Sequence, residues 1–169
     1  MVSQGQKRDI FKVDLKELNQ EERLAFGQTI SWEILGRVFD AVEERYGKEG
    51  RELLNKVVRD YMREITPRIA QSLGIVGNDM ASVLEVINWH DVNLWPLMDE
   101  DIAKSEEREG MLRINNCFLK DRWTPHECKI GIPYVEGMLE ALNPKIKYKA
   151  TKLLTLGDDC CELVMKLED

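Results

Sequence analysis

The chain has 169 residues, of which 43% are hydrophobic and 33% charged, so it is long enough to bury an ordinary core without disulfides or a structural metal. Its net charge of −7 argues against broad electrostatic binding to nucleic acid or to an anionic membrane. No apolar run approaches the roughly 18 residues that a spanning helix needs, and the start lacks the apolar segment of a signal peptide. We therefore expect a cytoplasmic protein.

The N-terminal part of the chain predicts an arm followed by a long helix. Residues 1–19 have the composition of an arm with limited structure. Asn19, followed by acidic residues, is suited to cap a helix whose apolar positions recur at helical spacing as far as Tyr46. Gly47 and Gly50 are expected to end this helix.

Two further helices follow. A regular apolar stripe predicts a helix over residues 51–73, and Pro67 should kink or restart it, with Thr66 capping the new start. Asp79 is suited to cap a third helix, whose predicted inner face consists of Met80, Val83, Leu84 and Ile87.

The second half of the chain changes to the period of strands. It predicts a hairpin, a helix and a second hairpin, at residues 101–106, 111–118, 132–142, 146–156 and 161–167. Gly110 should end the first hairpin loop, and the second turn should centre on Gly157. The alternation slips near Lys152, which predicts a bulge or a sheet edge. In the last strand, alternation places Cys161 on the buried face and Cys160 on the opposite face.

The order of elements predicts an α+β fold, in which N-terminal helices pack on a C-terminal antiparallel sheet of about four strands with an inserted helix. We expect a single domain over residues 1–169, made of the arm, a helical half at 20–95 and a sheet-containing half at 96–169. Helix one is apolar over more than one face, a pattern that fits either a dimer interface or a central core helix.

The chemistry-bearing residues gather in the last quarter, where Cys128 follows His126 by two positions. A nucleophilic cysteine needs a depressed pKa, which a nearby imidazole supplies, and in an extended segment both side chains would line one cavity. The alternative is a partly buried loop cysteine beside a surface histidine. Chains without an export signal usually keep their cysteines as thiols.

The other histidine, His90, lies between Trp89 and Asp91 at the end of the third predicted helix. It is a candidate general base or metal ligand, oriented by a carboxylate such as Asp91, or else a cap for the helix C-terminus. Trp89 and Trp95 favour an aromatic-walled pocket nearby or a well-filled core.

Cys117 and Cys161 complete the set of candidates. Cys117 shares a predicted strand face with Arg113, which suggests either solvent or a ligand cavity, and Cys161 on an apolar face is typical of a core thiol. If Cys117, Cys128, Cys161 and His90 converged, their soft thiolate and imidazole ligands would suit zinc or iron. The spacing itself requires no cofactor.

These residues also carry a resemblance. Arg113-x-x-x-Cys117, then Pro125-x-x-Cys128, then a helix and Gly157-Asp158-x-x-Cys161 on a hairpin resemble the L-2-amino-thiazoline-4-carboxylic acid hydrolase family, within the wider group of 4-vinyl-reductase-like, haem-NO-binding-like and TRAPP-like small-ligand domains.

The resemblance implies hydrolytic opening of a small sulfur- and nitrogen-containing ring. Cys128 would then be the reactive thiol, His126 or His90 the acid or base, and Arg113 the anchor for a substrate carboxylate, with Cys117, Trp89 and Trp95 beside the substrate. The alternatives are a non-enzymatic small-ligand or metal sensor that dimerises through its N-terminal helices, and a scaffold with no small-molecule site.

Overall fold

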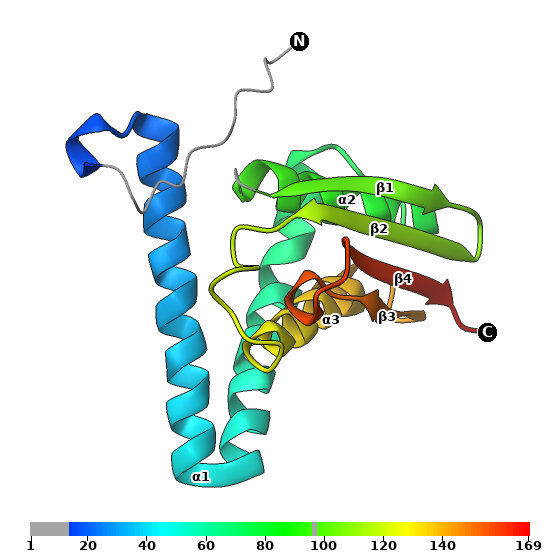
Figure 1. The fold of residues 1–169 in the computed structure, drawn as a ribbon. Coiled ribbons are helices and arrows are strands. Elements are labelled where there is room, and N and C mark those ends of the chain that lie inside the picture. The colour runs from blue at the N-terminus through cyan, green and yellow to red at the C-terminus, as the bar shows by residue number, and fades with distance from the viewer. Residues whose placement is uncertain (1–13, 96–97) are drawn as a thin grey trace.

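The computed structural model describes residues 14–95 and 98–169 (Figure 1). Its main elements, in chain order, are α1 (Gln20–Ser72), α2 (Met80–Leu94), β1 (Asp99–Ser105), β2 (Glu109–Asn116), α3 (Gly131–Leu142), β3 (Ile146–Lys152) and β4 (Cys161–Leu167). Short 3-10 helices lie at η1 (Leu15–Glu17), η2 (Glu127–Ile130) and η3 (Leu154–Leu156). The predicted α+β order is confirmed, and the part of the predicted arm before residue 14 lies outside the described residues.

The two first predicted helices form the two limbs of α1, which meet in a V (Figure 1). Asn19 caps the first limb as expected, because its side chain accepts from the Glu22 N–H and the Glu22 carboxylate accepts from the Asn19 N–H. The break falls at Gly47, whose φ of 64° and ψ of −154° lie outside the helical region and suit a residue without a Cβ. Gly50 is already inside the second limb.

The expected restart at Pro67 was wrong. The second limb stays helical through Pro67 as far as Ser72, and Thr66 does not cap a new helix. Its buried hydroxyl instead donates to the carbonyl oxygen of Met62, one turn earlier, at 2.6 Å. Thr66 thus bonds back to its own helix and leaves no free hydroxyl for a new N-cap.

A four-stranded antiparallel sheet in the order β1-β2-β4-β3 forms the other layer, as predicted. Helices α2 and α3 lie against one of its faces, and the second limb of α1 packs outside α3 (Figure 1). The register shifts between Ala150 and Lys152, where the alternation slips. Gly110 is not a loop residue: it lies in β2, and a Cβ there would meet Leu84 Cδ1 at 2.7 Å.

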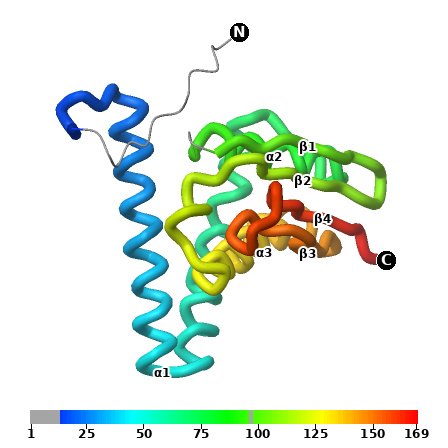
Figure 2. Tube along the Cα trace, in the orientation of Figure 1, coloured from blue at the N-terminus to red at the C-terminus, as the bar shows by residue number. Residues whose placement is uncertain are grey.

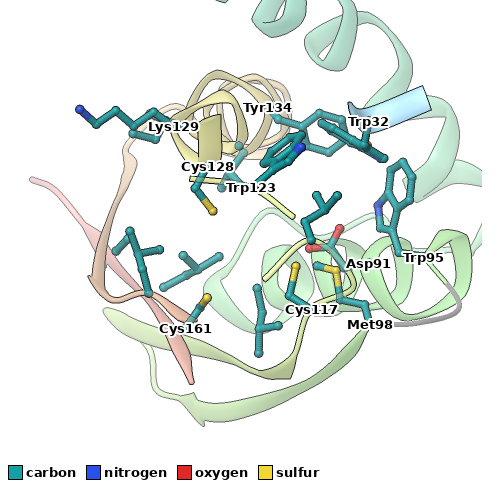
Figure 3. A pocket seen from close by; sticks show the side chains of 18 of the residues that line it. Trp32, Asp91, Trp95, Met98, Cys117, Trp123, Cys128, Lys129, Tyr134 and Cys161 are labelled. Carbon is teal, nitrogen blue, oxygen red and sulfur yellow. The ribbon is translucent and has the colours of Figure 1, made fainter. Parts of the chain in front are cut away.

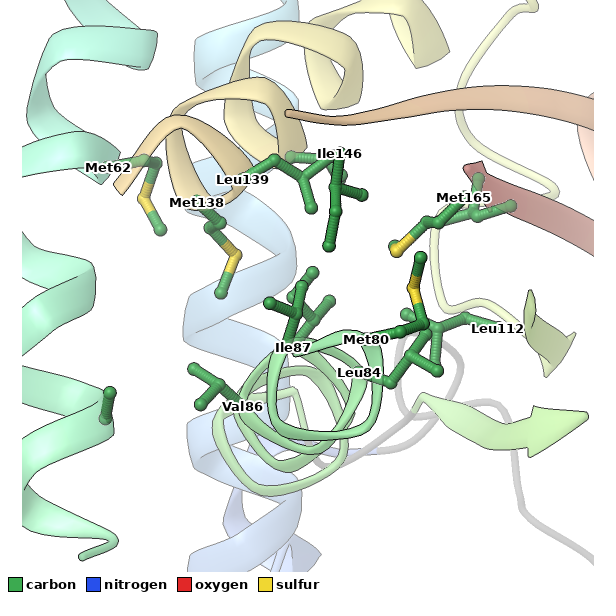
Figure 4. Packing of buried hydrophobic residues seen from close by; sticks show 14 of the residues in the cluster. Met62, Met80, Leu84, Val86, Ile87, Leu112, Met138, Leu139, Ile146 and Met165 are labelled. Atoms are coloured by element: carbon green, nitrogen blue, oxygen red, sulfur yellow. The ribbon is translucent and has the colours of Figure 1, made fainter. Parts of the chain in front are cut away.

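The core lies between the sheet and the two helices (Figure 4). Helix α2 is capped by Asp79 and buries all four side chains of its predicted inner face. They pack with flexible methionine and branched aliphatic side chains from α3 and the central strands: Met138, Leu139, Leu112 and Met165. Fully burying one such side chain contributes about 1.5–3 kcal/mol, so this cluster holds the helix layer on the sheet.

A smaller cluster fixes the loop between β2 and α3. Phe39 on the first limb of α1 is fully buried against Leu119, Trp123 and Ile130. The tube view shows this loop beside the first limb (Figure 2). The cluster therefore brings the first limb, the loop and the sheet to one place. Among the described helices, none is long and apolar enough to cross a membrane.

Candidate functional site

A cavity of about 180 Å³ lies where the sheet, α2, α3, the loop after β2 and the first limb of α1 meet (Figure 3). Its wall is almost entirely apolar, with aromatic side chains from five different segments of the chain: Trp32, Trp95, Phe118, Trp123, Tyr134 and Tyr148. An aliphatic cavity of roughly 150 Å³ is large enough for one benzene ring. The wall therefore encloses the space of a single small ring.

Trp32 is the contribution of the first limb to this wall. Its ring centroid lies 5.1 Å from that of Trp95, 5.5 Å from Trp123 and 5.8 Å from Tyr134, at edge-to-face or tilted angles. These are preferred geometries for aromatic pairs. The first limb is also tied down beside Trp32, because Glu33 pairs with Arg122 of the loop at 2.7 Å. Trp32 thus closes one side of the cavity.

Three cysteines that the sequence singled out meet on this wall. Cys117, Cys128 and Cys161 each line the cavity, and their sulfur atoms point into it (Figure 3). All are free thiols. Cys117 lies one residue beyond the end of β2, so the strand parity that placed it beside Arg113 does not apply to it. Cys161 is buried, as alternation predicted.

The three thiols are not activated. Burial raises the pKa of the Cys117 thiol to about 12, with a smaller opposing effect of the Leu119 N–H. Burial also raises the pKa of Cys128, partly offset by the Thr155 hydroxyl, and that of Cys161, partly offset by the Leu154 N–H. The thiolate is the reactive form of cysteine. Near neutral pH these side chains are therefore protonated, weakly polar wall groups.

Cys160 does not fit the prediction that it faces away into solvent. It is buried, although it lies outside the cavity wall, and its sulfur contacts the Asp159 carboxylate at 3.6 Å. It precedes β4 in a bend, so strand alternation does not set its direction.

His90 does not cap the end of α2; it lies inside the helix, 2% exposed, and makes two hydrogen bonds. Nδ1 lies 2.7 Å from Asp91 Oδ1, and Nε2 lies 2.9 Å from the Tyr134 hydroxyl. The carboxylate beside His90 is thus Asp91, the one that the sequence suggested. His90 itself lies behind the wall, while Asp91 and Tyr134 line the cavity. Burial, followed by the charge of Asp91, raises the pKa of Tyr134 well above its usual value.

The polar group extends from Asp91 to Glu100 in β1. Glu100 is 7% exposed; its Oε1 accepts from Asn88 Nδ2 at 3.3 Å, and its buried Oε2 receives no donor from the described residues. Burial first, then the charge of Asp91 and a hydrogen bond to it, raises the pKa of Glu100 to about 9. Glu100 is therefore protonated at neutral pH.

His126 lies outside the cavity. Residues 127–130 form a 3-10 helix instead of the extended segment that would have put His126 and Cys128 on one side. His126 Nε2 lies 3.0 Å from Glu43 on the first limb of α1, in a separate polar groove that Arg51 and Arg59 also line. Among the described residues, no hydrogen bond joins either histidine to a cysteine.

Two further predicted contacts also lie off the cavity wall. Arg113 is on the outer face of β2, where its guanidinium lies 3.6 Å from Glu162. Trp89 is 36% exposed and points away, whereas Trp95 lines the cavity as expected. Within residues 14–95 and 98–169, no group of three or more His, Cys, Asp or Glu side chains could hold a metal ion. The predicted metal site of Cys117, Cys128, Cys161 and His90 is therefore not supported.

Sequence reasoning missed three residues of the site: Tyr134, Glu100 and Trp32. Glu100 lies directly before the first predicted strand, at residues 101–106, and nothing in the sequence distinguishes it from its acidic neighbours. Tyr134 and Trp32 lie at positions that an ordinary core aromatic would also occupy.

Comparison with known proteins gives a family and a relative that match in sequence, and two proteins that match in structure. The sequence model of the L-2-amino-thiazoline-4-carboxylic acid hydrolase family matches residues 27–165. An uncharacterized protein of Archaeoglobus fulgidus is 26% identical over 139 residues, which cover 74% of this chain and 61% of that protein. The chain thus spans less than two thirds of the length of this relative.

Two solved structures share the fold. The phenol-responsive sensory domain of the transcription activator PoxR, solved with phenol, superposes with a TM-score of 0.59 at 16% identity, covering 80% of this chain and 74% of that domain. A trafficking protein particle complex subunit 3 from Naegleria fowleri, covalently bound to palmitic acid, has a TM-score of 0.54 at 14% identity, covering 83% of this chain and 97% of that subunit. The resemblance to a TRAPP-like fold is confirmed.

Proposed function

The chain belongs to the L-2-amino-thiazoline-4-carboxylic acid hydrolase family, and from that premise we propose that it binds one small, uncharged ring compound in the cavity between sheet and helices. The observation that carries this proposal is the cavity itself, about 180 Å³ in volume and walled by aromatic side chains and protonated thiols. Concave apolar sites with a few polar groups are the usual form of small-molecule sites.

The charges around the cavity favour a neutral ligand over an amino-acid-like anion. Asp91 is the one acidic side chain on the described wall, and Lys129 is exposed with its ammonium group directed away from the cavity (Figure 3). Arg113, the predicted carboxylate anchor, pairs with Glu162 outside. A carboxylate would therefore be buried without a cation, which is strongly unfavourable. A phenol-binding domain with the same fold supports the same class of ligand.

Quenching of tryptophan fluorescence tests the proposal, since Trp32, Trp95 and Trp123 line the cavity. Titration with phenol or toluene should quench the fluorescence of the native protein saturably. Ala150→Leu, which adds three carbon atoms inside the wall, should abolish saturation, whereas Ala103→Leu on the exposed edge strand should not. Unchanged binding in the Ala150→Leu variant would place the ligand elsewhere.

The second candidate is hydrolytic opening of a small sulfur- and nitrogen-containing ring, which family membership and the three wall cysteines favour. Cys128 would be the nucleophile, and His90, which contacts the wall residue Tyr134, would be the base. The raised pKa of Cys128 counts against its role as nucleophile. Chromatography of L-2-amino-thiazoline-4-carboxylate incubated with the protein, and with Cys128→Ala and Cys160→Ala variants, would detect it. Turnover lost only in Cys128→Ala would favour the hydrolase over the binding protein.

A homodimer is the third part of the proposal. The second limb carries Leu53, Val57 and Tyr61, spaced one turn apart and each about 60% exposed, and Ile34 and Val38 are exposed on the first limb. A row of exposed apolar side chains along a helix favours a protein partner. Sedimentation velocity of Val57→Glu, with the exposed Val76→Glu as control, should show a monomer only for the first variant. A wild-type monomer at micromolar concentration would refute the dimer.

A further inference from the structure

The donor and the acceptor can be assigned for each hydrogen bond behind the cavity. Asp91 Oδ1 lies 2.7 Å from His90 Nδ1, and the buried carboxyl of Glu100 in β1 is close enough to interact electrostatically with Asp91. An ionised carboxylate accepts hydrogen bonds and cannot donate them. His90 Nδ1 must therefore carry a hydrogen, which it donates to Asp91. We take this as the single hydrogen of the imidazole, so that Nε2 is an acceptor.

That assignment fixes the Tyr134 hydroxyl. Its distance of 2.9 Å to His90 Nε2 makes Tyr134 the donor in this hydrogen bond. The hydroxyl hydrogen is used in this contact, so the phenolic oxygen of the cavity-lining Tyr134 has only lone pairs left for a ligand. The row that produces this polarity contains the buried Glu100, Asp91 and His90 and the half-buried Tyr134.

The second cavity-lining tyrosine has no such connection. The Tyr148 hydroxyl donates to the backbone carbonyl oxygen of Ile132 at 3.1 Å, and a carbonyl is an acceptor irrespective of its surroundings. Tyr148 is therefore a matched control, since it is the same side chain on the same wall without the link to the buried histidine.

We propose that the Tyr134 oxygen is the specificity-determining acceptor of the cavity, so that its ligands are small ring compounds with an O–H or N–H donor. This inference rests on the proposed binding function and narrows its ligand class. A ring with a donor completes the row from the ligand through Tyr134 and His90 to Asp91, whereas a ring without one leaves the Tyr134 oxygen unpaired in an apolar space. His90 and Asp91 act as positioning residues, because neither touches the ligand in this scheme.

The test compares phenol with toluene, which has nearly the same shape and no donor. We expect the ratio of the two affinities to fall by about three- to tenfold in Tyr134→Phe, the range for one hydrogen bond, and to stay unchanged in Tyr148→Phe. Using the ratio within each variant removes the different hydration of the two probes. Thermal unfolding of each variant checks that it is folded.

Several outcomes would overturn the inference. If toluene binds and Tyr134→Phe leaves the ratio unchanged, the donor is accepted elsewhere, for example by Asp91. If benzonitrile, which has only an acceptor, loses as much affinity in Tyr134→Phe as phenol does, the hydrogen bonds run in the opposite direction. If neither phenol nor toluene binds the wild type, the proposed binding function fails first.

A second measurement needs no variant. In the wild-type protein, fluorinated phenols should bind more tightly as their O–H becomes a stronger donor, each measured relative to the matching fluorotoluene. A flat series would contradict the inference even if Tyr134→Phe did not fold.

Discussion

Replacing Glu100 by Gln should remove a pH dependence of stability that the buried acid pair creates. The pKa of Glu100 is raised from an ordinary 4.5 to about 9 in the folded protein, by burial and by Asp91. Between these values the folded chain holds a proton that the unfolded chain has released. The free energy of unfolding therefore falls as pH rises, by about 1.4 kcal/mol per pH unit for one proton.

The measurement is urea unfolding at pH 6, 7 and 8, followed by tryptophan fluorescence. Between pH 6 and pH 8 the free energy of unfolding of the wild type should fall by about 2–3 kcal/mol because of Glu100. Glu100→Gln is isosteric with the protonated acid and keeps a donor toward Asp91, so its stability relative to the wild type should rise by about 1.4 kcal/mol for each pH unit. The exposed carboxylates with lowered pKa, such as Glu109, lose their contribution only at more acidic pH.

Glu107→Gln is the matched control, because it makes the same change in charge on the exposed hairpin turn next to β1. Its free energy of unfolding should change with pH in parallel with that of the wild type. If the free energy of unfolding changes equally with pH in the wild type and in Glu100→Gln, the raised pKa of Glu100 is refuted. Asp91→Asn adds a check on the cause: by removing the neighbouring charge it should lower the pKa of Glu100 and shorten the pH range of the effect.

Two further predictions follow from burial and close packing. Burial raises the pKa of Cys117 to about 12. Its alkylation by iodoacetamide at pH 8 should therefore be roughly a thousandfold slower in the native than in the urea-unfolded protein. Equal rates, measured by mass mapping, would show that the cavity wall opens freely. Gly137→Ala should cost about 1–3 kcal/mol or more, because its Cβ would meet the Arg59 carbonyl oxygen at 2.4 Å between α1 and α3. Gly131→Ala on the same helix, with nothing within 4 Å of its Cβ, should be neutral or slightly stabilising in urea unfolding, and equal losses would contradict this packing.

The fold was predictable where one local rule acted without competition. The inner face of α2 followed from helical spacing, and Cys161 followed from alternation because β4 pairs on both sides and cannot rotate out of register. Prediction failed where packing overrode a residue preference. Pro67 stays within the second limb of α1, and Gly110 is small because α2 approaches β2 closely, not because a turn needs it.

The site was predictable in its location and not in its chemistry. The sequence correctly brought Cys117, Cys128 and Trp95 to one cavity, since they flank the elements that any sheet-and-helix layer must join. It paired His126 with Cys128 because they are close along the chain. In the folded protein the 3-10 turn sends His126 to Glu43, 83 positions away in sequence.

The polar residues that matter most are joined over long sequence separations. His90 and Tyr134 are 44 positions apart, and their contact depends on the packing of α3 against α2. No pattern of period 2 or 3.6 encodes such a pair, because each residue individually looks like a core position. What distinguishes them is the cost of burial: an acid pair, an imidazole and a phenol enclosed together must satisfy one another's donors and acceptors. Here Asp91, His90 and Tyr134 satisfy one another, and in our proposal the Tyr134 oxygen is then the acceptor that selects the ligand.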